Sequence, residues 1–456
     1  MTEVDIALTR EDNQGGDQNL NVGAGRQSTA VNGVDPYAVP PFVAKSLMLV
    51  AEQRNSACFT SDSTVQSVLF RLDAREIDAA IGPPRRYGLN IALVVDRSGS
   101  MEGAWLDHVK RACGSLLDLV EPTDFVSVVT FAETADLILP ARHISNKAEA
   151  KDRISRITAG NTTNLHQGLV MGFHQLSAVK HSGTLNKIIL VTDGGPTAGT
   201  KDLKSIINQI VDQKARGISV TTVGLGADYD EELLGTIANR AGGNFYHVPE
   251  PEKLGDVLRQ EVELLSKVVA RNLHMRVRLV RGAGVRQVYG HPPIYGNHVV
   301  ELDMCDVVAD SGIRSLWDFE ISTRSPGRYR IGQVDVRFDD VNTGRPERVT
   351  AELIYEFVSD PAAIAEVTGG ANFDVEIEVA EAVRTIDKTL LAVRRQNIDP
   401  SIVLTELEKV KAVFQKYGRD SAVATVANAI GDVQAGGAVA KILTNTVFNL
   451  DQGKVQ

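Results

Sequence analysis

The sequence predicts a multidomain protein: an α/β domain with a mostly parallel sheet and helices on both faces, inserted in or next to a β-sandwich, with a C-terminal helical region. Three observations lead to this fold class. Apolar strand-like runs alternate with helical patterns over residues 85–267. The apolar period then changes to two over residues 268–358. Over residues 359–456 apolar side chains recur every three or four positions, which is typical of helices.

Composition and charge narrow the class of protein. The chain has 456 residues, of which 43% are hydrophobic and 23% charged, and this ordinary globular composition excludes a wholly disordered chain. Its 48 basic and 58 acidic side chains give a net charge of −10, which argues against nucleic-acid binding because an acidic chain repels phosphates. No apolar run reaches the roughly 20 residues of a membrane helix, so no membrane span is expected.

The three cysteines, Cys58, Cys113 and Cys305, lie far apart and do not have metal-ligand spacing. We interpret them as thiols of a reducing compartment. Residues 1–19 lack the basic and apolar regions of a secretory signal. The sequence therefore predicts a cytoplasmic protein.

The N-terminal residues divide into a tail and a short strand region. Residues 1–38 are rich in Gly, Asn, Gln, Asp and Ser and hold little apolar surface, so a flexible tail is expected. Residues 39–84 contain about two strand-like runs, and two strands alone are barely stable. We therefore predict that they pair with strands within 270–358, which makes the α/β domain an insertion in the sandwich.

The α/β domain is expected over residues 85–267. Its continuous apolar runs are those of strands buried on both faces, and the segments between them show helical spacing. The expected strands are residues 89–95, 125–131, 135–139, 187–192, 218–223 and 244–248, and the expected helices are 105–120, 165–176, 203–215, 231–241 and 253–267.

The two C-terminal regions follow from the change of period. Alternation over residues 268–358 predicts an antiparallel sandwich of about five strands. Within residues 359–456, two apolar stripes and a cap for a third helix predict a helical bundle, with Asp399-Pro400 beginning the second helix. Such stripes indicate a bundle seam rather than a cofactor site.

The segment from Asp96 to Met101, DRSGSM, carries the chemistry. It follows a buried strand and precedes a helix, which places Asp96, Ser98 and Ser100 at the carboxyl edge of the sheet, where ligands bind in α/β folds. A carboxylate and two hydroxyls at alternate positions can turn three oxygens toward one point, and such oxygens suit Mg²⁺. The competing interpretation is helix capping, which explains one of these side chains but not all three.

Two further loops offer oxygen ligands at the same edge. Thr162-Thr163-Asn164 precedes the helix that begins at Leu165, and Asp193-Gly194 follows the second buried strand. A plain turn is the alternative for Asp193-Gly194, but its place directly after a buried strand favours a ligand site.

With these motifs the sequence resembles the von Willebrand factor A domain family, over roughly residues 88–265. The matching pieces are DRSGSM from Asp96, Thr163-Asn164 with Gly168-Leu169 downstream, and Thr192-Asp193-Gly194. The resemblance implies a Rossmann-like fold and a metal-ion-dependent adhesion site. The metal ligands that it implies are Asp96, Ser98, Ser100, Thr163 and Asp193. Thr163 is preferred to Thr162 because it directly precedes Asn164.

The flanking regions resemble a bacterial group related to inter-alpha-trypsin-inhibitor heavy chains and to calcium-activated chloride channel homologues. This resemblance implies a sandwich-like region around the A domain. The resemblance of residues 88–265 to A domains with a metal-ion-dependent adhesion site implies Mg²⁺ as the cofactor, with Mn²⁺ and Ca²⁺ as alternatives, and a protein partner that offers an Asp or Glu carboxylate to the ion. In the related integrin domains the last helix shifts on ligand binding, so the helix at 253–267 is expected to transmit binding.

Two other functions stay open on the sequence alone. One is a regulatory or assembly subunit that works with an AAA+ ATPase, as some A-domain proteins do. The other is a Mg²⁺-dependent hydrolase, which is disfavoured because the site is rich in hydroxyls and has no general base beside it. The sequence contains no HExxH, GxSxG or Walker motif, so we expect a protein that is not an enzyme.

One basic run has a plain structural interpretation. Arg276, Arg278, Arg281 and Arg286 lie in or beside an expected strand. Arg276 and Arg278 share one face of that strand, opposite its apolar residues, so a solvated face is preferred to a phosphate-binding patch.

Overall fold

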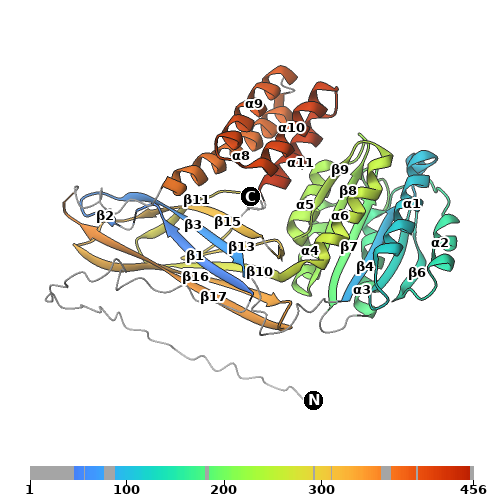
Figure 1. Cartoon of the computed structure of the whole chain (residues 1–456), viewed down its shortest axis with the longest axis horizontal. Coiled ribbons are helices and arrows are strands. Elements are labelled where there is room, and N and C mark those ends of the chain that lie inside the picture. The colour runs from blue at the N-terminus through green and yellow to red at the C-terminus, as the bar shows by residue number, and fades with distance from the viewer. Residues whose placement is uncertain are drawn as a thin grey trace, which may run out of the picture. The chain divides into compact units, whose positions relative to one another are not determined.

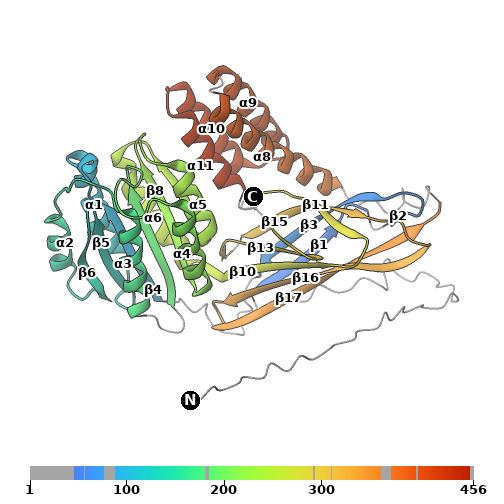
Figure 2. The ribbon, with the colours of Figure 1, turned by 180° about the vertical axis from the view of Figure 1, so that it is seen from behind.

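The computed structural model describes residues 46–55, 57–75, 88–179, 184–290, 293–309, 311–360, 371–396 and 399–451. The tail predicted for residues 1–38 lies outside these ranges. The predicted domain boundaries stay predictions. The described helices and strands form an α/β domain, a region of two further sheets and a set of C-terminal helices (Figures 1 and 2).

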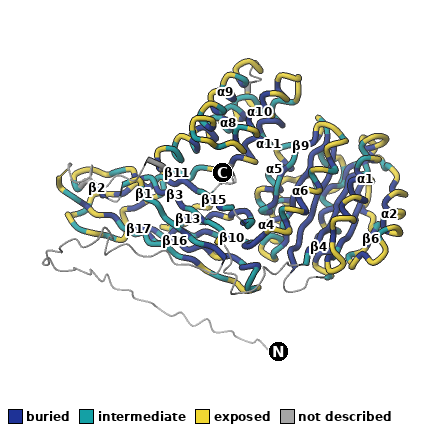
Figure 3. The backbone as a smooth tube through the Cα atoms, in the orientation of Figure 1, coloured by how far each residue is buried: buried dark blue, intermediate teal, exposed yellow. Residues whose placement is uncertain are grey.

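A six-stranded sheet lies at the centre of the α/β domain, residues 88–266, in the order β6-β5-β4-β7-β8-β9. Every neighbouring pair is parallel except β5 with β6. β4 and β7 are buried along nearly their whole length (Figure 3), as their continuous apolar sequences predict. The strands are β4 (Gly88–Asp96), β5 (Phe125–Phe131), β6 (Ala135–His143), β7 (Thr184–Thr192), β8 (Ile218–Leu225) and β9 (Phe245–Val248).

Helices cover both faces of this sheet, so the predicted α/β class is confirmed. On one face α1, α2 and α6 share a core with the sheet, and on the other face α3, α4 and α5 do so. The helices are α1 (Ala104–Leu119), α2 (Lys147–Ser155), α3 (Leu165–Ala178), α4 (Leu203–Ala215), α5 (Glu231–Ala241) and α6 (Leu254–Ser266), with short 3₁₀ turns η2 (Gly99–Met101) and η3 (Pro251–Lys253).

Helix α2 was not predicted, because its apolar pattern is weak. Only Ala150 and Ile154 are buried in it. Its beginning is nevertheless marked by Asn146, whose side chain accepts a hydrogen bond from the backbone N–H of Glu149.

The second region, which we call the two-sheet region, consists of strands before and after the α/β domain. One sheet has the order β1-β3-β15-β11, and the other has the order β12-β13-β10-β16-β17-β2, with β14 also paired to β10. Apolar side chains from both sheets form one shared core. The strands are β1 (Leu47–Gln53), β2 (Ala57–Phe59), β3 (Thr64–Ala74), β10 (Val268–Leu279), β11 (Ala283–Val288), β12 (Ile294–Gly296), β13 (Val299–Asp303), β14 (Val307–Val308), β15 (Gly312–Ile321), β16 (Gly327–Asp340) and β17 (Arg345–Val358).

The pairing of β3 with β15 confirms that the early strands join those beyond residue 268. The two strands are antiparallel, in a register that runs from Thr64 opposite Ile321 to Asp73 opposite Gly312. The chain thus leaves this region after β3, forms the α/β domain, and returns at β10, with the single residue Lys267 between α6 and β10.

Residues 268–358 form more strands than the five expected there, and β15 shows why. Its buried residues face both sides of the sheet. Leu316 of β15 and Leu69 of β3 pack against Phe373 of helix α8 (Ala371–Gln396), while Trp317 and Phe319 lie in the core between the sheets. A helix over the outer face removes the alternation of apolar and polar residues by which such a strand is recognised.

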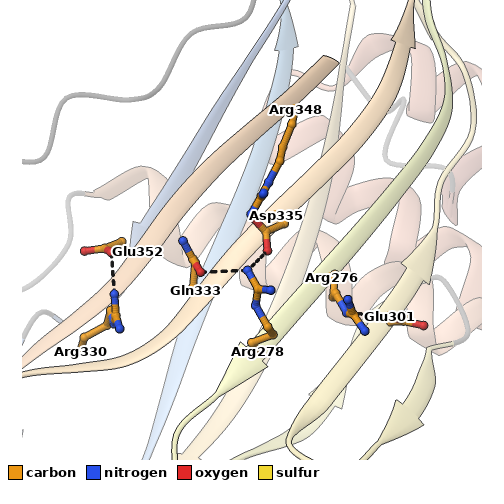
Figure 4. Close-up of polar contacts among 8 residues, drawn as sticks. All are labelled: Arg276, Arg278, Glu301, Arg330, Gln333, Asp335, Arg348 and Glu352. Carbon is orange, nitrogen blue, oxygen red and sulfur yellow. Dashed lines mark hydrogen bonds and ion pairs between the residues drawn. The ribbon is translucent and has the colours of Figure 1, made fainter. Parts of the chain in front are cut away.

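The outer face of the other sheet carries paired charges (Figure 4). Arg278 and Arg348 both form ion pairs with Asp335, which is only 3% exposed, and Arg276 Nε lies 3.0 Å from Glu301 Oε1. Arg276 and Arg278 do share a face of β10, as predicted. Their carboxylate partners favour a solvated, internally paired face over a phosphate patch.

The predicted C-terminal helical region is confirmed, with four helices in the described part rather than three. They share a core of their own. Asp399 caps the second of them by accepting a hydrogen bond from the N–H of Ser401, 2.9 Å away. After α8, the second helix is α9 (Pro400–Lys416), and it is followed by α10 (Asp420–Gln434) and α11 (Val439–Asp451).

Helix α11, which was not predicted, contacts the α/β domain at α5 and β9. Its Phe448 lies 6.0 Å from the ring of Phe245, measured between ring centroids, and joins the core of that domain. Across the ranges that the structure describes, no helix combines the length and apolar character needed to cross a membrane. Cys58, Cys113 and Cys305 are all buried, and none of them forms a disulfide within the described residues.

Candidate metal centre

The predicted site lies at the carboxyl edge of the six-stranded sheet. β4 and β7 are parallel neighbours, with Val95 opposite Val191, so the two strands deliver Asp96 and Asp193 to the same edge. The chain leaves β4 through α1 on one face, whereas α3 leads to β7 on the other face. Such a change of side opens a crevice at the strand ends, which is where α/β folds bind ligands.

Asp96 is fully buried and accepts two hydrogen bonds. The backbone N–H of Ser98 donates to its Oδ1 at 2.7 Å, and the Thr192 hydroxyl donates to its Oδ2 at 2.5 Å. Burial raises the pKa of the Asp96 carboxyl to about 6, although these bonds lower it, and the charge of nearby Asp193 adds to the rise. The proton is thus held more tightly here than on an ordinary aspartate.

Ser98, Ser100 and Asp193 form a chain of oxygens beside Asp96. The Oγ atoms of the two serines lie 3.2 Å apart, and Ser100 Oγ donates to Asp193 Oδ1 at 2.9 Å. Burial and the charge of Asp228 raise the pKa of the Asp193 carboxyl, while the bond from Ser100 lowers it. The structure therefore brings four of the five predicted residues into hydrogen-bonding distance of one another or of a shared partner.

Thr163 is bonded through its backbone to Thr197, in the loop that follows Asp193. Its N–H donates to Thr197 Oγ1 at 2.8 Å, and its carbonyl accepts from the N–H of Thr197 at 3.0 Å. Thr163 is 4% exposed. On the other side, the N–H of Gly99 donates to the carbonyl of Asn161 at 3.4 Å. The three predicted loops are thus bonded into one surface.

The beginning of α3 fixes the position of the loop that carries Thr163. Asn164 caps this helix by accepting a hydrogen bond from the N–H of Gln167. Gly168 lets the helix approach the sheet, since a Cβ atom there would lie 2.6 Å from Phe131 Cδ1. Thr162 Oγ1 is buried without a hydrogen-bond partner in the described part of the chain.

The chemistry of the site depends on hydroxyls as well as carboxylates. Among the described residues, no group of three or more His, Cys, Asp or Glu side chains is placed to hold a metal ion. The predicted set has two carboxylates and three hydroxyls, and all of its donors are hard oxygens of the kind that Mg²⁺ and Ca²⁺ take.

Three further residues at the site were not predicted from the sequence. Thr192 bonds to Asp96, Thr197 bonds to Thr163, and Asp228 acts on Asp193 through its charge. Thr192 ends its strand one residue before Asp193, so its place in the strand was the available signal. Asp228 follows β8, a strand whose loop we had not linked to the site.

Known proteins are similar to this chain in its α/β domain. Residues 90–260 match the model of the von Willebrand factor type A domain. The chain contains a von Willebrand factor type A domain. This A domain belongs to a family of protein-interaction modules, and it occupies the six-stranded sheet and its helices, which confirms the predicted resemblance.

Relatives of the A domain occur in bacteria and in animals. An uncharacterised protein of Synechocystis is 27% identical over 315 residues, covering 67% of this chain and 72% of its own. The uncharacterised protein YfbK of Escherichia coli is 28% identical over 190 residues, which is 41% of this chain and 33% of that protein. Human inter-alpha-trypsin inhibitor heavy chain H2 is 27% identical over 221 residues, covering 46% of this chain and 23% of its own.

Two solved structures share the fold beyond the A domain. A von Willebrand factor type A protein from Catenulispora acidiphila superposes with a TM-score of 0.67 at 16% identity, covering 91% of this chain and 99% of its own. The ArnB paralog VWA2 from Sulfolobus acidocaldarius gives a TM-score of 0.62, also at 16% identity, over 90% of this chain and all of its own. The arrangement of A domain, extra sheets and C-terminal helices thus recurs in other proteins.

Proposed function

We propose that this protein binds a divalent metal ion through Asp96, Ser98, Ser100, Thr163 and Asp193, and that the ion binds an acidic residue of a protein partner. The chain of oxygens from Ser98 through Ser100 to Asp193, beside the buried Asp96, carries this proposal. It supports a site in which hydroxyl and carboxylate oxygens at the edge of the sheet share one ion.

The charges around this point favour a cation. Burial is the main cause that raises the pKa values of Asp96 and Asp193, and the charges of Asp193 on Asp96 and of Asp228 on Asp193 add to the rise. Two buried carboxylates close together are costly unless a positive charge offsets them. A divalent ion supplies that charge, and Mg²⁺ is our first choice, with Mn²⁺ and Ca²⁺ as alternatives.

The exposure of the site supports recognition of an outside ligand. Asp96 and Ser98 are buried, whereas Ser100 and Gly99 beside them are exposed. An ion held by this set faces solvent on the side of Ser100. A carboxylate is the strongest neutral-pH protein ligand for such an ion, because it adds negative charge and oxygen donors together.

The side chains next to the site favour binding of a partner over catalysis. In the described part of the chain, the hydroxyl of Thr192 is bonded to Asp96 and that of Thr197 to Thr163. Both hydroxyls are poor general bases at neutral pH. We therefore propose a binding module rather than an enzyme, working as a cytoplasmic protein.

The first test is Mg²⁺ titration after treatment with EDTA. We expect heat of binding for the unsubstituted protein and none for Asp96→Ala, which loses a charged donor. Ser98→Ala should bind more weakly than the unsubstituted protein but still measurably, because it loses one neutral oxygen. Asp118→Ala, on the exposed end of α1 beside Lys151, is the matched control and should bind normally.

The second test addresses the partner. Capture of proteins in Mg²⁺ and in EDTA should differ, and proteins held only in Mg²⁺ should be released by substituting one Asp or Glu on their surface. Normal Mg²⁺ binding by Asp96→Ala would refute the metal site. Capture that is the same in EDTA would refute a role of the ion in recognition.

A further inference from the structure

The loop of residues 226–230 lies between the proposed metal site and helix α11. It follows β8 at the same edge of the sheet as Asp96 and Asp193, because β7 and β8 are parallel neighbours. Asp230 ends the loop and caps α5 by accepting a hydrogen bond from the N–H of Leu233 at 2.9 Å. Any movement of this loop therefore acts on the edge where the site is built.

One face of the loop contacts the site. A Cβ atom built on Gly195 would lie 3.7 Å from the Cβ atom of Asp230. The loop thus lies against the segment that carries Asp193.

The other face of the loop is held by Lys441 of α11, which is 8% exposed. Its ammonium lies 3.9 Å from the centroid of the Tyr229 ring and 3.6 Å from Glu231 Oε2, and it also donates to the backbone carbonyl of Tyr229. These contacts lie on both sides of Asp230. A buried cation over a ring gains more than an exposed one, because water does not compete for it.

Tyr229 is itself fixed. It is 2% exposed, and its hydroxyl lies 2.8 Å from His247 Nδ1. Its ring packs directly on Gly224, where a Cβ atom would lie 2.5 Å from the ring. The loop is therefore clamped between β8 and β9 on the inside and α11 on the outside.

We infer that Lys441 is a positioning residue for the metal site, which it reaches through the loop of residues 226–230. The inference rests on the proposed function and adds to it a control of that site by the C-terminal helices. The C-terminal helices thereby set how the Asp193 segment is presented to the ion. By linkage, an ion bound at the site stabilises the docking of α11 by the same free energy.

The test compares Lys441→Met, which keeps length without charge, with Lys441→Arg, which keeps charge. We expect Lys441→Met to weaken Mg²⁺ binding about fivefold to tenfold, as is typical of coupling between sites. Lys441→Arg should restore most of the affinity. Glu231→Gln, a milder change that removes only the ion pair, should weaken binding less, and Lys409→Met on the exposed face of α9 should have no effect.

Hydrogen exchange provides a readout that needs no ligand. Without metal, Lys441→Met should speed exchange in residues 226–230, while Lys409→Met should not. With Mg²⁺, exchange in residues 439–451 should slow in the unsubstituted protein and not in Lys441→Met.

The outcomes separate the two proposals. If the unsubstituted protein binds Mg²⁺ and both Lys441→Met and Glu231→Gln bind it equally well, this inference is wrong and the metal site stands. If the unsubstituted protein does not bind Mg²⁺, the proposed function fails and the control of the site fails with it. Unchanged metal-free exchange at residues 226–230 in Lys441→Met would overturn the positioning role by itself.

Discussion

Asp96 links protonation to stability, and in the proposed site it is also a ligand of the metal ion. Its pKa is about 6 in the folded, metal-free protein and near the ordinary value of 3.8 when unfolded. Between these values the folded state binds more protons than the unfolded state. The stability that this residue contributes is therefore full below about pH 4 and is lost as the pH rises through about 6.

We expect Asp96→Asn to stabilise the metal-free protein at pH 7. The amide carries no charge to bury, and the Thr192 hydroxyl can turn to accept a bond from it. We expect the free energy of unfolding, measured with urea in EDTA, to rise by about 1 to 3 kcal/mol.

Adding Mg²⁺ should reverse this order. The ion stabilises the unsubstituted protein by mass action but finds one charged ligand fewer in Asp96→Asn. Equal stabilisation of both proteins by Mg²⁺ would show that Asp96 is not a ligand.

Helix α6 is fastened to the sheet by a buried charge. Glu261 is 1% exposed, and its carboxylate lies 3.3 Å from Lys187 Nζ on β7. It also accepts hydrogen bonds from Thr221 at 2.6 Å, Asn244 at 2.8 Å and Tyr246 at 2.9 Å. Burial alone would raise the pKa of Glu261, but Lys187 and these bonds outweigh it and lower the pKa. A shift of α6 on ligand binding, which stays a prediction, has to break these contacts.

We expect Glu261→Gln to destabilise the A domain strongly. It leaves the Lys187 ammonium buried without its charge partner, which costs about 3 to 5 kcal/mol. Urea unfolding measures this, with the exposed Glu263→Gln of the same helix as control. A loss no larger than that of the control would mean that the pair does not hold α6.

The helices and strands that were predicted from the sequence are those whose residues all meet one kind of surroundings. β4 and β7 are buried on both faces and read as continuous apolar runs, so the sheet edge and Asp96, Ser98 and Asp193 could be placed. Elements with mixed environments were missed: β15 lies under a helix, and α11 divides its apolar side chains between two cores. Contacts such as that of Lys441 with Tyr229 join residues 212 positions apart, which no local pattern reports.

Phe448 joins the C-terminal helices to the A domain. Phe448→Ala should remove apolar packing against Phe245 and lower the free energy of unfolding by about 3 to 5 kcal/mol. Native-state hydrogen exchange should therefore quicken at residues 231–248 of the A domain as well as in α11. Ile402→Ala, on the exposed face of α9, is the control and should change neither. Faster exchange confined to α11 would contradict a shared core.

The route of the chain through β3 and β10 has a mechanical consequence. The A domain is tethered at both ends, by β3 in one sheet and by β10 in the other. Under the proposed function, a pull from a bound partner therefore acts on two strands at once. β3 is bonded on both sides, by β1 and β15, and β10 by β13 and β16. Because antiparallel bonds stand perpendicular to the strands, the part of such a pull that runs along a strand shears many of them together instead of unzipping them singly.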